Sequence, residues 1–179
     1  MVKGKKGALE LSVNTIVVIV IGVTLLTLGL VFVRGIITKA NDLSDKAFED
    51  ANTQLDSLGG NINEFVTVSP ETVRVNAGDT SGFVVLIKNV ESASYNNIMA
   101  NVKTSADALT NNVKCEFLDG SETKSVKSPL GSGAQDRIKI RVKTSKSSIG
   151  SFGCEFSLSG GGIEQSTYST RRDIEIIAK

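Results

Sequence analysis

The N-terminal part of the chain contains one long apolar run. Residues 11–33 carry no charge, and the stretch from Ile16 to Val33 is almost wholly apolar. A helix of about 20 apolar residues crosses a bilayer core of ~30 Å, so the run predicts a membrane-spanning helix. Three lysines stand among the first six residues. The positive-inside rule places them on the cytoplasmic side and everything after the span outside.

The helical pattern continues beyond Val33. Apolar residues recur at intervals of three and four, which is typical of one stripe on an amphipathic helix. Gly59-Gly60 is a natural helix stop. We therefore expect an unbroken helix over residues 8–58, with a membrane or filament-core half (8–33) and an amphipathic half (34–58) that must pack on something. The stripe comprises Ile36, Ile37, Ala40, Leu43, Ala47, Phe48, Ala51, Leu55 and Leu58.

After Gly60 the pattern changes from helical spacing to alternation. Short runs of alternating apolar and polar residues between Gly, Asn and Ser turns predict strands of a β-sandwich. Phe83–Ile87 is apolar throughout and is expected to be a central strand. Residues 61–179 suit an immunoglobulin-like sandwich, which takes about 100 residues. The expected fold class is α+β, a long N-terminal helix followed by an immunoglobulin-like antiparallel β-sandwich. The other expected strands lie at 65–68, 72–75, 98–102, 113–117, 138–142, 152–158 and 174–176.

The position of the apolar run argues against an ordinary secretory signal. Such a signal has a shorter core and is cut after it, at a small-residue site. Here the chain continues after Val33 as RGIITKAND, whereas a small residue, Gly7, stands before the run. The pattern indicates a basic leader, residues 1–7, that is removed in front of a helix which stays on the protein.

Composition excludes several function classes. The formal net charge is +1, and −2 without the three leader lysines, so no nucleic-acid partner is expected. With no histidine and two cysteines, the usual tetrahedral Cys/His zinc site is excluded within one chain. The glycine clusters at 131–133 and 160–162 complete no phosphate-binding motif and are expected to be turns. We expect no cofactor, no catalytic residues and no enzymatic activity.

The two cysteines fall on the inner faces of their predicted strands. Outside the cytoplasm, an oxidising setting would allow a Cys115–Cys154 disulfide. The alternative is two buried free thiols, which behave as small hydrophobic side chains. A strip of basic residues at Lys139, Arg141 and Lys143 is expected to be a solvated strand face.

Two features of the N-terminal helix admit more than one interpretation. Glu10 is the helix-start charge: it could pair with the free amine of a neighbouring copy, or simply lie among lipid headgroups. Thr15, Gly22 and Gly29 recur every seven residues, and small residues on one face allow close helix packing in an apolar medium. Glycine is also common in membrane helices without such a role.

The Lys-Lys-Gly leader, the acidic residue that follows and the retained helix together resemble type IV pilin-like precursors with class III signal peptides. The resemblance implies cleavage between Gly7 and Ala8 by a membrane-embedded prepilin peptidase. Archaeal members often carry an immunoglobulin-like head, as expected here. The sequence departs from bacterial pilins, which usually have Phe first and Glu fifth in the mature chain; here these positions hold Ala8 and Ser12, with Glu10 third.

The resemblance implies a structural subunit of an extracellular archaeal type IV pilus-like filament, with adhesion as its expected role. Its partners would be further copies of itself in a helical filament, the prepilin peptidase, and the membrane before assembly. The precursor would be inserted in the membrane and the mature protein would lie at the cell surface. The alternatives are a monomeric membrane-anchored surface protein with an immunoglobulin-like binding domain, and an archaellin, the subunit of a motility filament.

Overall fold

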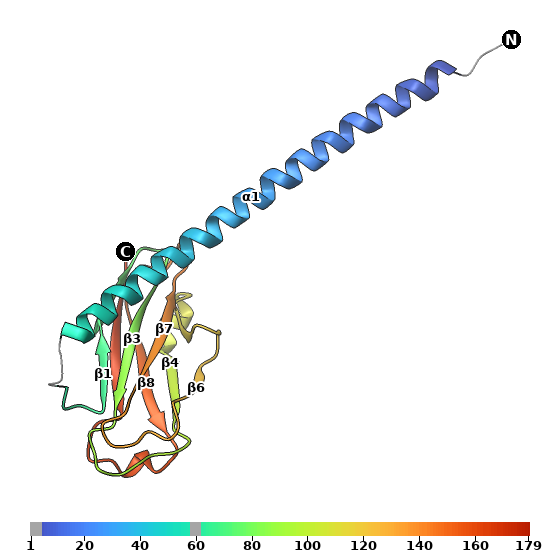
Figure 1. Ribbon diagram of the computed structural model, residues 1–179. Coiled ribbons are helices and arrows are strands. Elements are labelled where there is room, and N and C mark those ends of the chain that lie inside the picture. The colour runs from blue at the N-terminus through green and yellow to red at the C-terminus, as the bar shows by residue number, and fades with distance from the viewer. Residues whose placement is uncertain (1–4, 58–61) are drawn as a thin grey trace. The chain divides into compact units, whose positions relative to one another are not determined.

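The computed structural model describes the backbone of residues 5–57 and 62–179, and the side chains of 14–34, 45–57 and 62–179 (Figure 1). The chain divides into two compact units, Met1–Ala40 and Asn41–Lys179. We call the second of these the C-terminal unit.

One helix, α1, extends from Lys5 to Ser57. Helix is expected here because no proline occurs before Pro70 and the apolar spacing stays helical throughout. The expected end at Leu58 and the Gly59-Gly60 stop lie outside the described residues. Residues 41–57 of α1 belong to the C-terminal unit.

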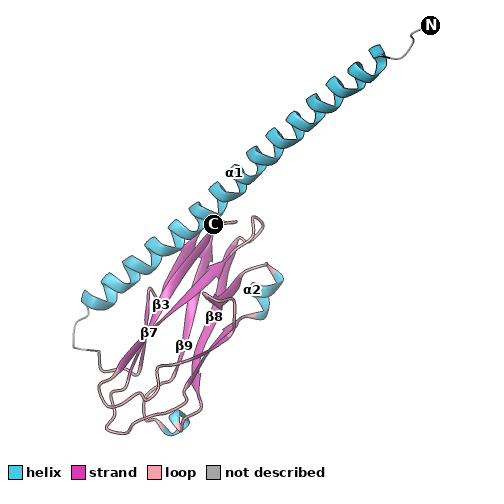
Figure 2. Ribbon diagram, turned by 45° about the vertical axis from the view of Figure 1, so that its right-hand side comes forward, coloured by secondary structure: helices cyan, strands magenta, loops and turns pink. Residues whose placement is uncertain are grey.

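The remainder of the C-terminal unit is a sandwich of two sheets (Figure 2). Neighbouring strands are antiparallel except β2 and β9, which are parallel. The short helix α2 (Ala106–Thr110) and the 3₁₀ turn η2 (Ile163–Gln165) complete the unit. The first sheet has the order β1 (Val66–Ser69), β3 (Thr80–Lys88), β7 (Gln135–Lys143), β5 (Lys114–Phe117). The second has the order β2 (Thr72–Val75), β9 (Arg171–Ala178), β8 (Gly150–Ser159), β4 (Met99–Thr104), β6 (Thr123–Ser125).

The core lies between the sheets and is formed by the alternate residues of each strand. In β7, for example, Ile138, Ile140 and Val142 are buried, whereas the residues between them face outward. This alternation is what the sequence predicted, and the structure confirms the α+β fold class. Two elements were not expected: β6 has no apolar residue to mark it, and α2 is a single capped turn in which Ser105 Oγ accepts a hydrogen bond from Ala108 N.

Strand β3 is apolar on both faces because both faces are covered. Phe83, Val85 and Ile87 enter the sandwich core, while Val84 and Leu86 point outward and are also buried. The amphipathic stripe of α1 covers them with Phe48, Ala51 and Leu55, which are at most 2% exposed. Residues 45–57 of the predicted amphipathic half therefore pack on the sheet of their own chain, whereas the side chains of its other stripe residues lie outside the described part of the structure.

Gly82 makes room for this contact. It continues the outward row of β3, and a Cβ built on it would lie 2.4 Å from Phe48 Cε1 and 2.7 Å from the Ile140 carbonyl oxygen. Only glycine lets the aromatic ring approach the backbone this closely. Lys139, from the neighbouring strand, places its Nζ 5.2 Å from the centre of the same ring, a cation–π contact.

The helix–sheet contact yields a first prediction. Leu55→Ala should lower the free energy of unfolding by about 2–4 kcal/mol, because it leaves a cavity between α1 and β3. The same substitution at Leu109, which is 54% exposed, is the matched control and should change stability by about 0.5 kcal/mol or less. Chemical unfolding of the full chain in detergent, followed by circular dichroism, measures both. Equal effects would contradict the docking of α1 on β3.

Candidate functional site

The most unusual surface is the apolar segment Asn14–Arg34 of α1. Its mean hydropathy is 3.0, and it is long and apolar enough to cross a membrane. The large apolar side chains in it are 50–70% exposed, and none of the segment is buried. Burying one such side chain is worth about 1.5–3 kcal/mol relative to leaving it in water. The segment therefore requires an apolar environment.

The hydroxyl groups of Thr24 and Thr27 in the segment are bonded within the helix. Thr24 Oγ1 donates to the Val20 carbonyl oxygen at 2.7 Å, and Thr27 Oγ1 to the Val23 carbonyl oxygen at 3.0 Å. A hydroxyl bonded to its own backbone needs no water, which suits a helix in lipid or in a dry bundle.

The small residues of the predicted packing face lie on open helix surface. A Cβ added at Gly22 or Gly29 would meet nothing within 4 Å. Thr15 is likewise exposed. Among the residues that the structure describes, none comes close enough to require glycine at these two positions. The packing role of the three residues stays a prediction.

The predicted cleavage site and helix-start charge fall at the beginning of α1. Gly7, Ala8 and Glu10 are helical, but their side chains lie outside the described residues. Cleavage after Gly7 and a pairing role for Glu10 therefore also stay predictions.

In the C-terminal unit, Cys115 and Cys154 form a disulfide. Cys115 lies on β5 and Cys154 on β8, so the bond joins the two sheets across the core, where both residues are at most 2% exposed. Their Cα atoms are 6.4 Å apart. In the loop-closure model a bond across 39 positions contributes about 4 kcal/mol, and it ties the edge strand β5 to the centre of the opposite sheet.

A second unusual group is a buried carboxylate on the outer face of the first sheet. The Glu116 side chain is 4% exposed although its strand position faces outward. Its Oε2 pairs with Lys114 Nζ at 3.1 Å, and its Oε1 pairs with Arg141 Nη2 at 3.0 Å and Lys143 Nζ at 2.5 Å. Burial alone would raise the pKa of Glu116, but hydrogen bonds from the three cations outweigh it and lower the pKa from 4.5 to about 2.

Lys139 and Lys143 are exposed, as expected for a solvated strand face, but the strip also makes specific contacts that the sequence did not predict. Lys139 packs over the Phe48 ring, and Arg141 and Lys143 hold Glu116. Arg137, the first outward cation of β7, pairs with Asp56 of α1 at 2.6 Å. Every outward cation of β7 thus has a partner. Arg137 and Lys139 contact α1, whereas Arg141 and Lys143 pair with the buried Glu116.

Sequence reasoning missed Glu116 because its partners are distant in the chain. The alternation of Lys114 to Phe117 already places Glu116 outward beside Lys114. The pairing of β5 with β7, which sets Glu116 opposite Arg141, is a matter of strand register. Alternation alone does not reveal which strands are neighbours.

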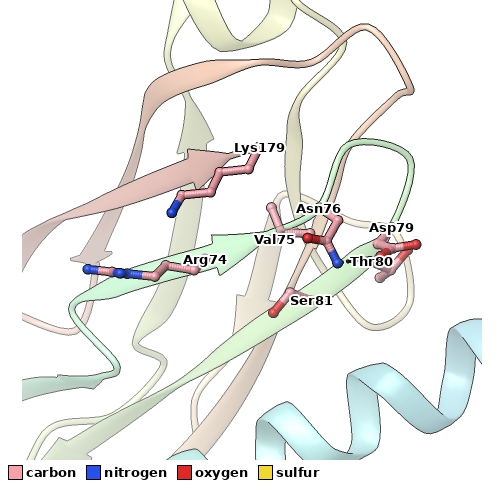
Figure 3. A pocket seen from close by; sticks show the side chains of 7 residues that line it. All are labelled: Arg74, Val75, Asn76, Asp79, Thr80, Ser81 and Lys179. Carbon is pink, nitrogen blue, oxygen red and sulfur yellow. Dashed lines mark hydrogen bonds between the residues drawn. The ribbon is translucent and has the colours of Figure 1, made fainter.

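One surface hollow of the C-terminal unit is lined mostly by polar residues without a cluster of catalytic groups. This hollow, of about 190 Å³, lies where β2 ends and β3 begins; Asn76 Nδ2 donates to Asp79 Oδ2 there, and the Arg74 guanidinium points away from both (Figure 3). Its lining is Arg74, Val75, Asn76, Asp79, Thr80, Ser81 and Lys179. Among the residues that the structure describes, no group of three or more His, Cys, Asp or Glu side chains is placed to hold a metal ion.

No protein-family model matches the sequence, and no curated protein matches it either. Solved structures similar to the chain include a CARDB domain from Pyrococcus furiosus, with 12% identity, a TM-score of 0.40, and coverage of 64% of this chain and 94% of that one.

Two further similar structures are an MSP-domain-like protein from Caenorhabditis elegans and a conjugative transposon lipoprotein from Bacteroides eggerthii. The first has 10% identity and a TM-score of 0.38, and covers 63% of this chain and 98% of its own. The second has 10% identity and a TM-score of 0.40, and covers 62% and 91%. At these values the likenesses say nothing about activity, ligand or partner.

The buried carboxylate predicts a specific dependence on pH. Between about pH 4.5 and pH 2 the unfolded chain takes up a proton at Glu116 that the folded protein does not. The contribution of Glu116 to stability, about 2–3 kcal/mol, is therefore complete above pH 4.5–5 and is lost as the pH falls through this window.

Glu116→Gln should remove that contribution at pH 7 and flatten the acid dependence of the unfolding free energy between pH 4.5 and 2. Glu122→Gln, at an exposed position, is the matched control and should leave both unchanged. Denaturant titrations at a series of pH values provide the measurement. A Glu116→Gln protein as acid-sensitive as the unmodified one would refute the assignment.

Proposed function

We propose that the protein is the structural subunit of an extracellular type IV pilus-like filament, with adhesion as its expected role. It assembles through the N-terminal helix after a prepilin peptidase removes residues 1–7. The observation that carries the proposal is the exposure of the apolar segment Asn14–Arg34 on a helix that continues without a break into the C-terminal unit.

The apolar segment must be shielded from water, which favours an assembled or membrane-inserted protein over a free soluble monomer. Exposing one fully apolar helix to water costs about 25 cal/mol for each Å². Lipid removes that cost before assembly, and copies of the same segment remove it in a filament. The internally bonded hydroxyls of Thr24 and Thr27 suit both surroundings.

The construction of the C-terminal unit supports an extracellular location. Its disulfide belongs to an oxidising compartment, and Phe48, Ala51 and Leu55 of the helix stripe are buried against β3. Residues 45–57 therefore connect the apolar segment to a folded unit and leave no comparable apolar stripe of their own to cover.

A monomeric, membrane-anchored surface protein is the second candidate, because lipid alone also covers the apolar segment. Electron microscopy of sheared surface filaments, with mass spectrometry of their subunit, separates the two. The proposal predicts filaments whose subunit begins at Ala8. A protein recovered only as a detergent-extracted monomer that retains residues 1–7 would contradict it.

Leader processing gives a direct prediction. Gly7→Leu should abolish removal of residues 1–7, because the peptidase implied by the resemblance requires a small residue at the cut. Gly4→Leu places the same side chain within the leader and should leave processing intact. The mass of the intact protein distinguishes the two forms, and a normal-sized mature protein from Gly7→Leu would disprove the cut site.

The predicted packing face of Thr15, Gly22 and Gly29 gives a further testable prediction. Because a Cβ at Gly29 meets no described atom within 4 Å, Gly29→Leu is expected to act mainly on contacts with other molecules. It should reduce filament yield about tenfold while membrane insertion continues, which corresponds to a loss of about 1.4 kcal/mol from close helix packing. Val31→Leu, on the opposite side of the helix, is the control. Equal filament yields from both variants would argue against a specific packing face.

A further inference from the structure

The cluster around Glu116 carries more positive charge than it uses. Three cations, Lys114, Arg141 and Lys143, share one carboxylate, and we call these three residues the cation patch. The side chains of Lys114 and Lys143 are 45% and 49% exposed, so both lysines reach solvent beyond the buried Glu116. The patch therefore presents an excess of two positive charges at a surface.

The cations of the patch are held in position. Glu116 receives all three of them at distances of 3.1 Å or less. Lys114 and Lys143 are also directly opposite each other in the register of β5 and β7. Two like charges at such a position repel each other. Glu116 offsets this repulsion with one negative charge against three positive ones, and a further carboxylate above the lysines would offset the remainder.

The part of helix α1 that belongs to the same unit, residues 41–57, carries an excess of negative charge. Asp45, Glu49 and Asp50 are exposed, and no ion pair joins any of them to another residue of the described chain. Asp56, in contrast, is already bonded to Arg137. Lys46 is the only basic residue between positions 41 and 57. We call Asp45, Glu49 and Asp50 the acidic helix face.

The two surfaces lie on different elements of one unit. The helix packs on β3 and reaches β7 through Arg137 and Lys139 (Figure 1). The cation patch lies on β5 and at the end of β7, the same end of the sheet at which Phe48 contacts Gly82, because Gly82 is paired with Arg141. No ion pair joins the patch to the acidic helix face within the described residues of one copy, so each copy carries both halves of a charge-complementary contact.

We propose that the cation patch binds the acidic helix face of a second copy of this chain. The inference rests on the proposed filament and specifies a contact between its subunits. The two surfaces differ, so the contact is heterologous, which is the kind that extends into an open helical polymer. Charge contacts of this type set register and association rate, and they weaken as salt screens them.

The test removes the charge from the helix without changing its shape. The full-length triple variant Asp45→Asn, Glu49→Gln, Asp50→Asn alters only exposed positions. Its critical concentration for filament assembly at low salt should rise about 5- to 10-fold, as expected for three exposed charge pairs. Its assembly should also lose most of the salt dependence that the unmodified protein shows.

A matched control removes three exposed carboxylates elsewhere. Glu71→Gln, Asp107→Asn, Glu122→Gln changes net charge by the same amount and should assemble as the unmodified protein does. If the helix variant also assembles normally at every salt concentration, the inference is wrong while the filament proposal stands. If the unmodified protein forms no filament, the proposed function fails, and this inference fails with it.

A second measurement identifies the contact directly. Filaments are grown from a mixture of ¹⁵N-labelled and unlabelled subunits and treated with a carbodiimide, which joins adjacent amines and carboxylates. Mass spectrometry should find Glu49 or Asp50 joined to Lys114 or Lys143 in pairs of mixed isotope composition. Cross-links that join these residues only within one copy, or none between them, would overturn the inference.

Discussion

The apolar surface of residues 14–34 is the constraint on which the rest of the protein depends. Its large apolar side chains are 50–70% exposed along a segment long enough to span a bilayer, and Thr24 and Thr27 are bonded to their own helix. Such a surface must always be covered, first by lipid and then, in the proposed assembly, by copies of itself. A free soluble state is the one condition that it excludes.

Residues 45–57 of the same helix pack on the folded unit. Phe48, Ala51 and Leu55 cover the outward side chains of β3, and Gly82 lets Phe48 approach the strand. The ion pair between Asp56 and Arg137 adds a polar clamp at the edge. The disulfide then connects that sheet to the opposite one through β5.

Features that depend on local sequence pattern could be predicted from the sequence. Features that depend on which strands are neighbours in the sheet could not. Alternation located most of the strands. Helical spacing located the stripe whose Phe48, Ala51 and Leu55 pack on β3. The inner-face positions of the two cysteines allowed their disulfide to be expected. The continuous apolar run of β3 was correctly interpreted as a central strand, although it is apolar because helix and core cover opposite faces. The ion pairs of Glu116 depend on the register of β5 with β7, which no local pattern contains.

Electron cryomicroscopy of surface filaments tests the central claim most directly, because it shows what covers residues 14–34. The account predicts a solvent-free centre built from this segment of every copy, with the sandwiches outside it and with Ala8 as the first residue of each subunit. A filament whose centre is formed by the sandwiches, or one in which residues 14–34 remain in contact with water, would contradict it.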